Sequence, residues 1–487
     1  MNNSRIIGLL QTFSATEMRR LGEFVRSPYF NKHEGVLALF AVLEAAYPDF
    51  SSSSLDRERL CQCLLSHVIS LQQLQDITSY LTRLLERFLA QERWESQPLQ
   101  RQGQLVFSLR ERKMSKEHLR AYIKWQKLLP KPQSVSEYLD YYHIEEEGMH
   151  TQVLERKRKT APHLQKAIQA FDHYYLLNRL RYACALLNRR IVLADEAELS
   201  WARQLYHHIN ENRTQWQTHP LIVAYHQLFH LLDHEGEDEF RAIEEHLEAH
   251  LSLISPASLR ELYAHLMNFC IKKLNEGNQD YQARLFALYQ DQLAQGILLD
   301  EGQISPADYK NIVSLALRNE AFDWVGAFIE DYKNKLPPDR QEVAYRYQKA
   351  NLHFHLADYS SCLRLLRTQE FEDSYYQLGA KTMVLKVHFE TGDFEAFYYA
   401  AAAFESFLQR NRKIPAYQKE LYLNLIRFSK RLAKLYIQHQ IGSSMLKKAQ
   451  LLRLDKRLSK HRKIAQSAWI LSKMDRLLVQ QGIFSDS

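Results

Sequence analysis

The residues best suited to chemistry in this chain are histidines that recur at helical spacing. Five of them cluster in this way: His226, His230, His234, His246 and His250. Two imidazoles one turn apart project from the same helix face and can share a Zn²⁺ ion. The glutamate of an HExxH motif is missing, because Glu235 directly follows His234. The cluster therefore has two interpretations, a zinc site or the polar face of an amphipathic helix, and we expect the second.

Two other patterns could hold a metal. Glu147 and His150 have the E-x-x-H spacing of di-iron bundles, but such a site needs a second copy of the motif. Cys61 and Cys63 lack a second Cys/His pair at zinc-finger spacing. No G-x-G-x-x-G, P-loop or nucleophile-elbow pattern is present. We expect a protein that is not an enzyme and holds no metal or cofactor; a nucleophile that only the fold brings beside a histidine stays open.

Positive charge is concentrated near the C-terminus. Residues 427–476 hold 14 Lys and Arg against Asp455 and Asp475, although the whole chain carries only +7. The candidates for phosphate binding are Arg453, Lys456, Arg457, Lys460 and Lys463, and all but Lys456 fall on one helical stripe. Such a stripe can neutralise phosphates of nucleic acid or anionic lipid, or face an acidic protein. The alternative is the solvated face of a terminal capping helix. Nine further basic residues lie in 101–131. If they faced the same way as the C-terminal stripe, nucleic-acid binding would be favoured.

The elements that must position these residues are helices. The 487 residues include only 14 Gly and 12 Pro, which leaves few tight turns and favours helix-forming residues. Capping boxes, in which a hydroxyl and an acid or amide three residues later bond each other's backbone amides, are predicted at Ser14, Ser70 and Ser134. Ser255 and Ser305 each precede a Pro at the first helical position. We therefore expect an all-α fold.

A turn motif recurs within the helical text. The stretch "ETGDF" at 390–394 has relatives that end in an aromatic residue, and these repeat-turn anchors are Phe240, Tyr281, Phe322, Tyr359 and Phe394. They are 41, 41, 37 and 35 residues apart. This period is typical of stacked helical hairpins, in which each pair of helices buries its apolar face against its neighbours. Gly or a small polar residue would end the first helix in a left-handed conformation, and the acid before the ring would cap the second helix.

The turn at Gly392, Asp393 and Phe394 resembles that of tetratricopeptide repeats, "G-D-Y-x-x-A". The small residue that this repeat has three positions after the ring is Cys362 in one copy and larger in the others. Longer stretches resemble a family of uncharacterised bacterial proteins: "RSPYFNKHEGVLALF", 171–193, "LYAHLMNFCIKKLNEGNQDY" and "SPADYKNIVSLALRNEAFDWVGAFIEDYKNKLPP". The resemblance implies an all-helical, tetratricopeptide-like chain and no particular activity.

The N-terminal part has one candidate docking surface. In "RSPYFNK", Pro28 ends a helix, and Tyr29 and Phe30 form either an aromatic plug between two helices or a surface for a partner. The start of the chain has no secretory leader, no window is apolar enough to span a membrane, and the five cysteines are scattered. We therefore expect a cytoplasmic protein without a transmembrane segment.

Together these observations predict four regions. An N-terminal helical domain (1–100) and a basic helical connector (101–170) precede a tetratricopeptide-like α-solenoid (171–420) and a basic C-terminal helical cap (421–487). The predicted function is a protein–protein interaction scaffold or adaptor that binds a protein or peptide partner in the groove lined by the first helix of each hairpin. The alternative is a regulator associated with nucleic acid or the ribosome through the basic C-terminal helices. The sequence leaves the partner, the pathway and the oligomeric state open.

Overall fold

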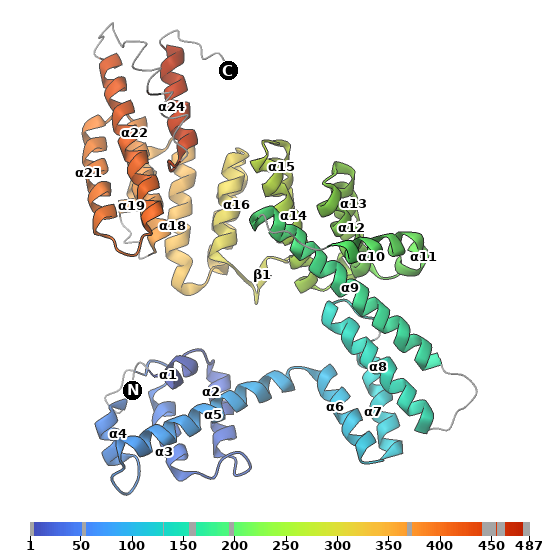
Figure 1. The fold of residues 1–487 in the computed structure, drawn as a ribbon. Coiled ribbons are helices and arrows are strands. Elements are labelled where there is room, and N and C mark those ends of the chain that lie inside the picture. Colours follow the sequence, from blue (N-terminus) through green and yellow to red (C-terminus); the bar gives the residue numbers. More distant parts are fainter. Residues whose placement is uncertain are drawn as a thin grey trace. The chain divides into compact units, whose positions relative to one another are not determined.

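The prediction of an all-α chain is confirmed by a computed structural model. It describes residues 4–50, 55–129, 131–154, 162–193, 199–367, 373–440, 454 and 463–480. Nearly all of these residues lie in helices (Figure 1). One short hairpin is an exception, where β1 (Leu299–Asp300) pairs antiparallel with β2 (Gln303–Ile304). Within the described ranges, every helix is too short or too polar to cross a bilayer.

The helices follow one another closely along the chain. The first are α1 Arg5–Leu10, α2 Ala15–Arg26, α3 Glu34–Ala46, α4 Arg57–Cys63, α5 Leu71–Glu95, α6 Pro98–Glu111, α7 Ser115–Leu128, α8 Val135–Leu154, α9 Pro162–Leu193, α10 Ser200–Glu211 and α11 Arg213–Trp216. The next are α12 Pro220–His234, α13 Glu237–His250, η2 Leu251–Leu253, α14 Pro256–Asn275, α15 Asp280–Ala294, α16 Pro306–Arg318, α17 Phe322–Tyr332 and η3 Lys333–Lys335. The last are α18 Pro338–His355, α19 Tyr359–Arg367, α20 Ser374–Glu390, α21 Phe394–Arg410, α22 Ala416–Gln440 and α24 Ser467–Gln480.

Helix starts follow the predicted caps with one difference. Ser14 and Ser70 form complete capping boxes with Glu17 and Gln73. At Ser134 the hydroxyl accepts the amide of Glu137, but the Glu137 carboxylate accepts the amide of Gln133 (2.7 Å) and not that of Ser134. The carboxylate therefore caps the residue before the serine.

The helices form two compact units. The first holds the described residues of Met1–Ala183, Leu199–Phe229 and His246–Ser255. In it α1–α5 enclose one apolar core, and the predicted face of α5, which runs from Ile77 to Phe88, lies inside that core. A smaller core joins α6, α7 and α8 around the buried ring of Trp125. Gly103 lies directly beneath that ring, so the close approach of α6 and α7 depends on its missing side chain.

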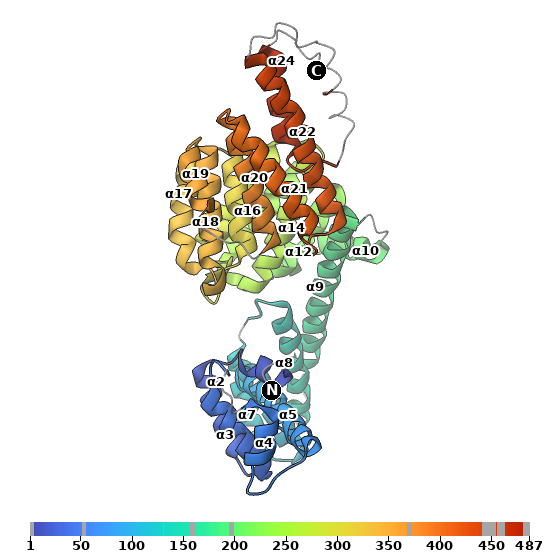
Figure 2. The ribbon, with the colours of Figure 1, turned by 90° about the vertical axis from the view of Figure 1, so that its left-hand side faces the viewer.

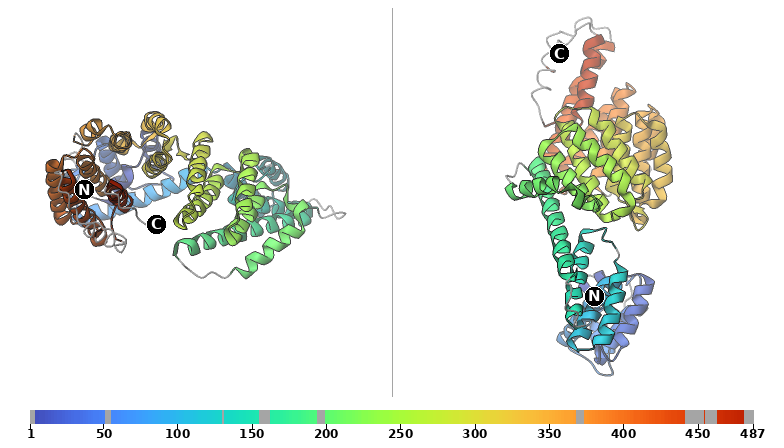
Figure 3. Two further views of the ribbon diagram at one scale, coloured as in Figure 1. Left: turned by 90° about the horizontal axis from the view of Figure 1, so that it is seen from above. Right: turned by 90° about the vertical axis from the view of Figure 1, so that its right-hand side faces the viewer.

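The second unit holds the described residues of Cys184–Glu198, His230–Glu245 and Pro256–Ser487. Consecutive helices pack in pairs: α14 with α15, α16 with α17, α18 with α19, and α20 with α21. The first helices of successive pairs also touch, α16 with α18 and α18 with α20, and Figure 2 shows them side by side. Figure 3 gives two further views of these helices. The last described helices, α22 and α24, close this unit over an apolar core shared with α20 and α21.

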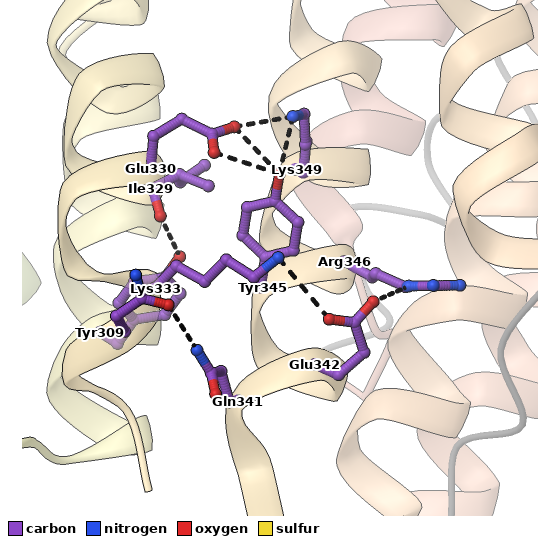
Figure 4. A network of polar contacts seen from close by, with 10 residues as sticks. Tyr309, Ile329, Glu330, Lys333, Gln341, Glu342, Tyr345, Arg346 and Lys349 are labelled. Atoms are coloured by element: carbon purple, nitrogen blue, oxygen red, sulfur yellow. Dashed lines mark hydrogen bonds and ion pairs between the residues drawn. The ribbon is translucent and has the colours of Figure 1, made fainter. Parts of the chain in front are cut away.

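A polar network links one helix pair to the next (Figure 4). Glu330 of α17 accepts hydrogen bonds from Tyr345 (3.0 Å) and Lys349 (2.7 Å), both on α18. The hydrogen bond from Lys349 is the main reason that the pKa of Glu330 lies below its usual value. Beneath this network the buried Tyr309 hydroxyl of α16 donates to the carbonyl of Ile329 (3.1 Å). Polar contacts therefore tie α16, α17 and α18 together at the edge of their apolar contacts.

Candidate functional site

The five repeat-turn anchors lie at corresponding places in the structure. Phe322, Tyr359 and Phe394 are the first residues of α17, α19 and α21, and Tyr281 is the second residue of α15. Phe240, in the first turns of α13, and Tyr281 are buried, whereas the other three rings are half-buried. Phe240 lies 5.8 Å from the ring of Tyr281, so the anchors of two successive turns touch.

Each of the five turns contains one residue with a left-handed backbone. These residues are Glu235 (φ 62°), Gly277 (φ 101°), Glu320 (φ 56°), Ala357 (φ 59°) and Gly392 (φ 72°). In three of the turns the next amide donates back to the carbonyl five residues earlier, as Asp358 does to His353 (2.9 Å), which is the Schellman closure. Only two of the five residues are Gly, and none is a small polar residue. The closing hydrogen bonds hold Glu320 and Ala357 in a conformation that their side chains disfavour.

The acid before the anchor caps the second helix in two of the pairs. Asp393 accepts the amide of Ala396 (3.0 Å), and Asp358 accepts that of Ser361 (3.1 Å). The hydrogen bonds from Ser361 and Ser360 lower the pKa of Asp358 to about 2. No side chain caps α15 or α17 in this way.

The anchors define equivalent positions on the first helices. Ser314, Asn351 and Lys386 each precede the anchor of their pair by eight residues, on α16, α18 and α20. Arg318 and His355 precede it by four, one helical turn further on. All five residues line one hollow of about 340 Å³. Because positions i and i+4 share a helix face, α16 and α18 present matching stripes to this hollow, and α20 contributes the first of the two positions.

Two cations line the hollow, and neither has a hydrogen bond to a described carboxylate. Lys386 is half-buried, and its ammonium donates to the side-chain oxygen of Gln466 (3.3 Å). Glu390, one turn further along α20, would be its natural ion-pair partner. The Glu390 carboxylate instead accepts from Trp469 (2.8 Å) and Lys473 (2.6 Å). Burial lowers the pKa of Lys386 to about 8, because the raising effect of the Glu390 charge does not outweigh burial and the nearby charge of Lys473.

The second cation is Arg318, which is exposed at the edge of the hollow. Among the described residues its guanidinium has no ion-pair partner. The described lining includes no Asp or Glu at all. The hollow therefore has a positive potential that nothing in its described lining neutralises.

Aromatic rings form much of the remaining wall. Tyr347 and Phe354 come from α18, Tyr375 from α20 and Tyr422 from α22. Tyr347 and Tyr375 lie 6.0 Å apart, and the Lys386 ammonium lies 4.8 Å from the Phe354 ring. Gly379 makes room for this arrangement, because a methyl group there would meet the Tyr347 hydroxyl at 2.1 Å.

The candidate docking residues Tyr29 and Phe30 differ in their surroundings. Phe30 stacks on Phe24 with ring centroids 4.0 Å apart, and the guanidinium of Arg87 lies 4.8 Å from the centroid of the Phe30 ring. Tyr29 is 81% exposed and contacts Phe30 edge-on. Phe30 thus acts as the aromatic plug of the turn, and Tyr29 projects from it.

The histidine cluster does not converge on one point. His226 stacks on Tyr206 (4.4 Å), whereas His230 and His234 bond each other through their Nδ1 atoms (2.8 Å). His246 contacts the carbonyl of Pro220 (2.8 Å), and His250 contacts that of His246. In the part of the chain that the structure describes, no three His, Cys, Asp or Glu side chains come close enough to hold a metal ion.

The E-x-x-H glutamate belongs to a helix-packing contact. Glu147 is buried and pairs with His118 of α7 (2.9 Å) and Arg110 of α6 (3.3 Å). On the same helix the buried Glu145 pairs with His163 of α9 (3.0 Å). The two carboxylates therefore join α8 to its neighbours.

Most of the predicted phosphate-binding stripe lies outside the described residues, namely Arg453, Lys456, Arg457 and Lys460. Lys463 is described and pairs with Glu420 (3.2 Å). Lys430 and Lys473, in the same basic segment, pair with Glu405 (2.8 Å) and Glu390 (2.6 Å). Acids from other helices thus neutralise these three cations.

The sequence analysis missed the cationic hollow. Aligning the first helices on their anchors places Arg318, Asn351 and Lys386 on one stripe, but Glu390 falls on the same stripe, so the sequence alone does not indicate an uncompensated charge. Comparisons with protein-family models, with curated proteins and with solved structures gave no match. The functional conclusion therefore rests on the geometry described above.

Proposed function

We propose that this protein is a non-enzymatic interaction scaffold with a tetratricopeptide-like solenoid. It would bind an acidic segment of a partner protein along the first helices α16, α18 and α20. The observation that supports this proposal best is the hollow between these helices, which has cations and aromatic rings but no described carboxylate in its lining. The rings would hold apolar side chains, and Arg318 and Lys386 would form charge-assisted hydrogen bonds with acidic ones.

The recurring turn supports the repeat architecture. Equivalent left-handed residues and matching first-helix stripes are expected when one hairpin unit is repeated along a chain. The α16–α18 and α18–α20 contacts agree with a stack in which each pair covers part of its neighbour. On these grounds we propose that the protein is a tetratricopeptide-like helical-repeat protein, and we propose from its sequence resemblance alone that it belongs to the bacterial family named above.

The proposal is tested by affinity purification of the tagged full-length chain from its native cells. Arg318→Glu reverses a charge at the hollow, and Arg410→Glu makes the same change on the exposed end of α21, a second helix. We expect a protein partner that is lost with Arg318→Glu and retained with Arg410→Glu. Equal recovery with both variants would overturn the proposal.

A nuclease arm of the same experiment tests the alternative function. If the protein acts through nucleic acid, nuclease should release the partners, and charge reversal at Lys456, Arg457, Lys460 and Lys463 should abolish retention on a nucleic-acid column. The scaffold proposal expects neither change to affect the partner. The ion pair of Lys463 with Glu420 also favours the scaffold, because it occupies one cation of the predicted stripe.

A further inference from the structure

The hollow between α16, α18 and α20 has the features of a small-molecule site. Its volume of about 340 Å³ falls at the lower end of the range of ligand pockets, about 300–1,000 Å³. Such pockets combine apolar and aromatic walls with a few polar groups that fix the ligand's orientation. Here the walls are the rings of Tyr347, Phe354, Tyr375 and Tyr422, and amides of Asn351 and Gln466 complete the lining.

The positive charge of Lys386 is compensated only in part, by the charge of Glu390 and by the rings of Phe354 (4.8 Å) and Trp469 (5.4 Å). A cation that is partly removed from water is costly unless it is paired. Lys386 donates to an amide oxygen, while Trp469 and Lys473 occupy the carboxylate of Glu390. An anion that enters the hollow would supply the missing counter-charge to Lys386 and would meet Arg318 at the edge.

The rings define the rest of the ligand. Flat aromatic surfaces favour a planar partner, through offset stacking or edge-to-face contact. Tyr347 and Tyr375 belong to different helices, and their rings lie 6.0 Å apart and are tilted by 58°, so a planar ligand would meet one ring face-on and the other edge-on. Gly379 lets the Tyr347 hydroxyl pack directly against α20, which fixes the position of this ring.

We infer that this hollow binds a small free molecule with a planar ring and an anionic head group, with the ring against Tyr347 and Tyr375 and the head group between Lys386 and Arg318. This inference goes beyond the scaffold proposal and does not depend on it, because it requires no protein partner. Carboxylate and phosphate share the required chemistry of the head group.

Ligand-observed NMR, which measures direct binding of small molecules to the full-length chain, tests the inference with four probes. Benzoate and phenyl phosphate carry both features, benzamide has the ring without the charge, and inorganic phosphate has the charge without the ring. We expect at least one of the first two to bind at least about 10-fold more tightly than both benzamide and inorganic phosphate. Equal binding of benzamide would refute the role of charge, and equal binding of inorganic phosphate would refute the role of the rings.

Matched variants locate the site. Lys386→Met should weaken the better-bound probe at least about 10-fold. Lys381→Met should leave it unchanged, because Lys381 lies on the same helix but packs over the Phe407 ring (4.8 Å). Equal effects of the two variants, or none from either, would contradict the assignment.

The pH dependence gives a second readout that a structural role for Lys386 would not produce. The groups that face Lys386 are Arg318 of α16, His355 of α18, Glu390 of α20 and Lys473 of α24. Burial and the charge of Lys386 lower the pKa of His355, which moves its titration away from that of Lys386. Affinity should fall as the pH rises through about 8 and Lys386 loses its proton, and this fall should be absent in Lys386→Met. A fall that persists in the variant would overturn the inference.

Discussion

Replacing Ala357 with Gly should stabilise the protein, although Gly normally weakens helical proteins. Ala357 has φ 59°, and it is exposed, so its methyl group contributes little packing. A left-handed conformation costs an L-residue about 1–2 kcal/mol, and Gly adopts it without that cost. Gly also increases the entropy of the unfolded chain, which cancels about 0.4–1 kcal/mol of this stabilisation. The expected net gain in the free energy of unfolding is therefore about 0.5–1 kcal/mol.

The assay is urea denaturation of the full-length chain followed by circular dichroism, with the same substitution elsewhere as control. Ala403 is exposed within α21, and Ala403→Gly should lower the free energy of unfolding by about 1 kcal/mol. One chemical change thus has opposite signs at two exposed alanines. If both variants were destabilised equally, Ala357 would not have a left-handed backbone and the account of the repeated turn would fail.

Three further predictions concern packing and charge. Gly379→Ala should lower the free energy of unfolding by about 1–3 kcal/mol, because the new methyl group has no space. Gly326→Ala, within α17, should raise it by about 0.5–1 kcal/mol, because the nearest atom, on Leu352, would lie 3.8 Å from the methyl group. Similar effects of the two variants in urea denaturation would count against the close packing at the hollow. Phe240→Ala should lower the free energy of unfolding by about 3–5 kcal/mol, because the ring of Phe240 is fully buried. Tyr29→Ala should change it by less than about 0.5 kcal/mol, because Tyr29 is exposed. Comparable losses in the two variants would rule out the anchor role of Phe240. Lys386→Met should stabilise the protein at about pH 7, because the pKa of Lys386 is lowered in the folded state and its charge therefore opposes folding below about pH 8. This opposition disappears as the pH rises toward the usual lysine pKa near 10.4. A stability gain that does not shrink between about pH 7 and 10 would contradict the burial of a charged lysine.

Local signals explain which parts of the fold could be predicted from the sequence. The capping boxes at Ser14 and Ser70 depend on residues three positions apart, and the buried face of α5 depends on helical periodicity. The anchor turns are likewise predictable from local sequence, because the ring and the acid are neighbours in the chain. Even so, the identity of the left-handed residue was not predictable, because hydrogen bonds such as that from Asp358 to His353 hold it without Gly.

The hollow could not be predicted because it depends on contacts between distant segments. The i, i+4 spacing of Lys386 and Glu390 would predict an ion pair. The structure replaces it with bonds from Trp469 and Lys473 to Glu390, and these residues are 79 and 83 positions further along the chain. This exchange leaves Lys386 without a hydrogen-bonded carboxylate, although the charge of Glu390 still acts on it. The ion pair of Lys463 with Glu420, which spans 43 positions, was hidden from the sequence for the same reason.

Hydrogen–deuterium exchange of the chain with its co-purified partner tests the central claim most directly. The scaffold account predicts added protection on the first helices α16, α18 and α20, strongest near Arg318 and Lys386, with little change on α17, α19 and α21. Protection confined to the second helices, or to the basic C-terminal segment and abolished by nuclease, would contradict it.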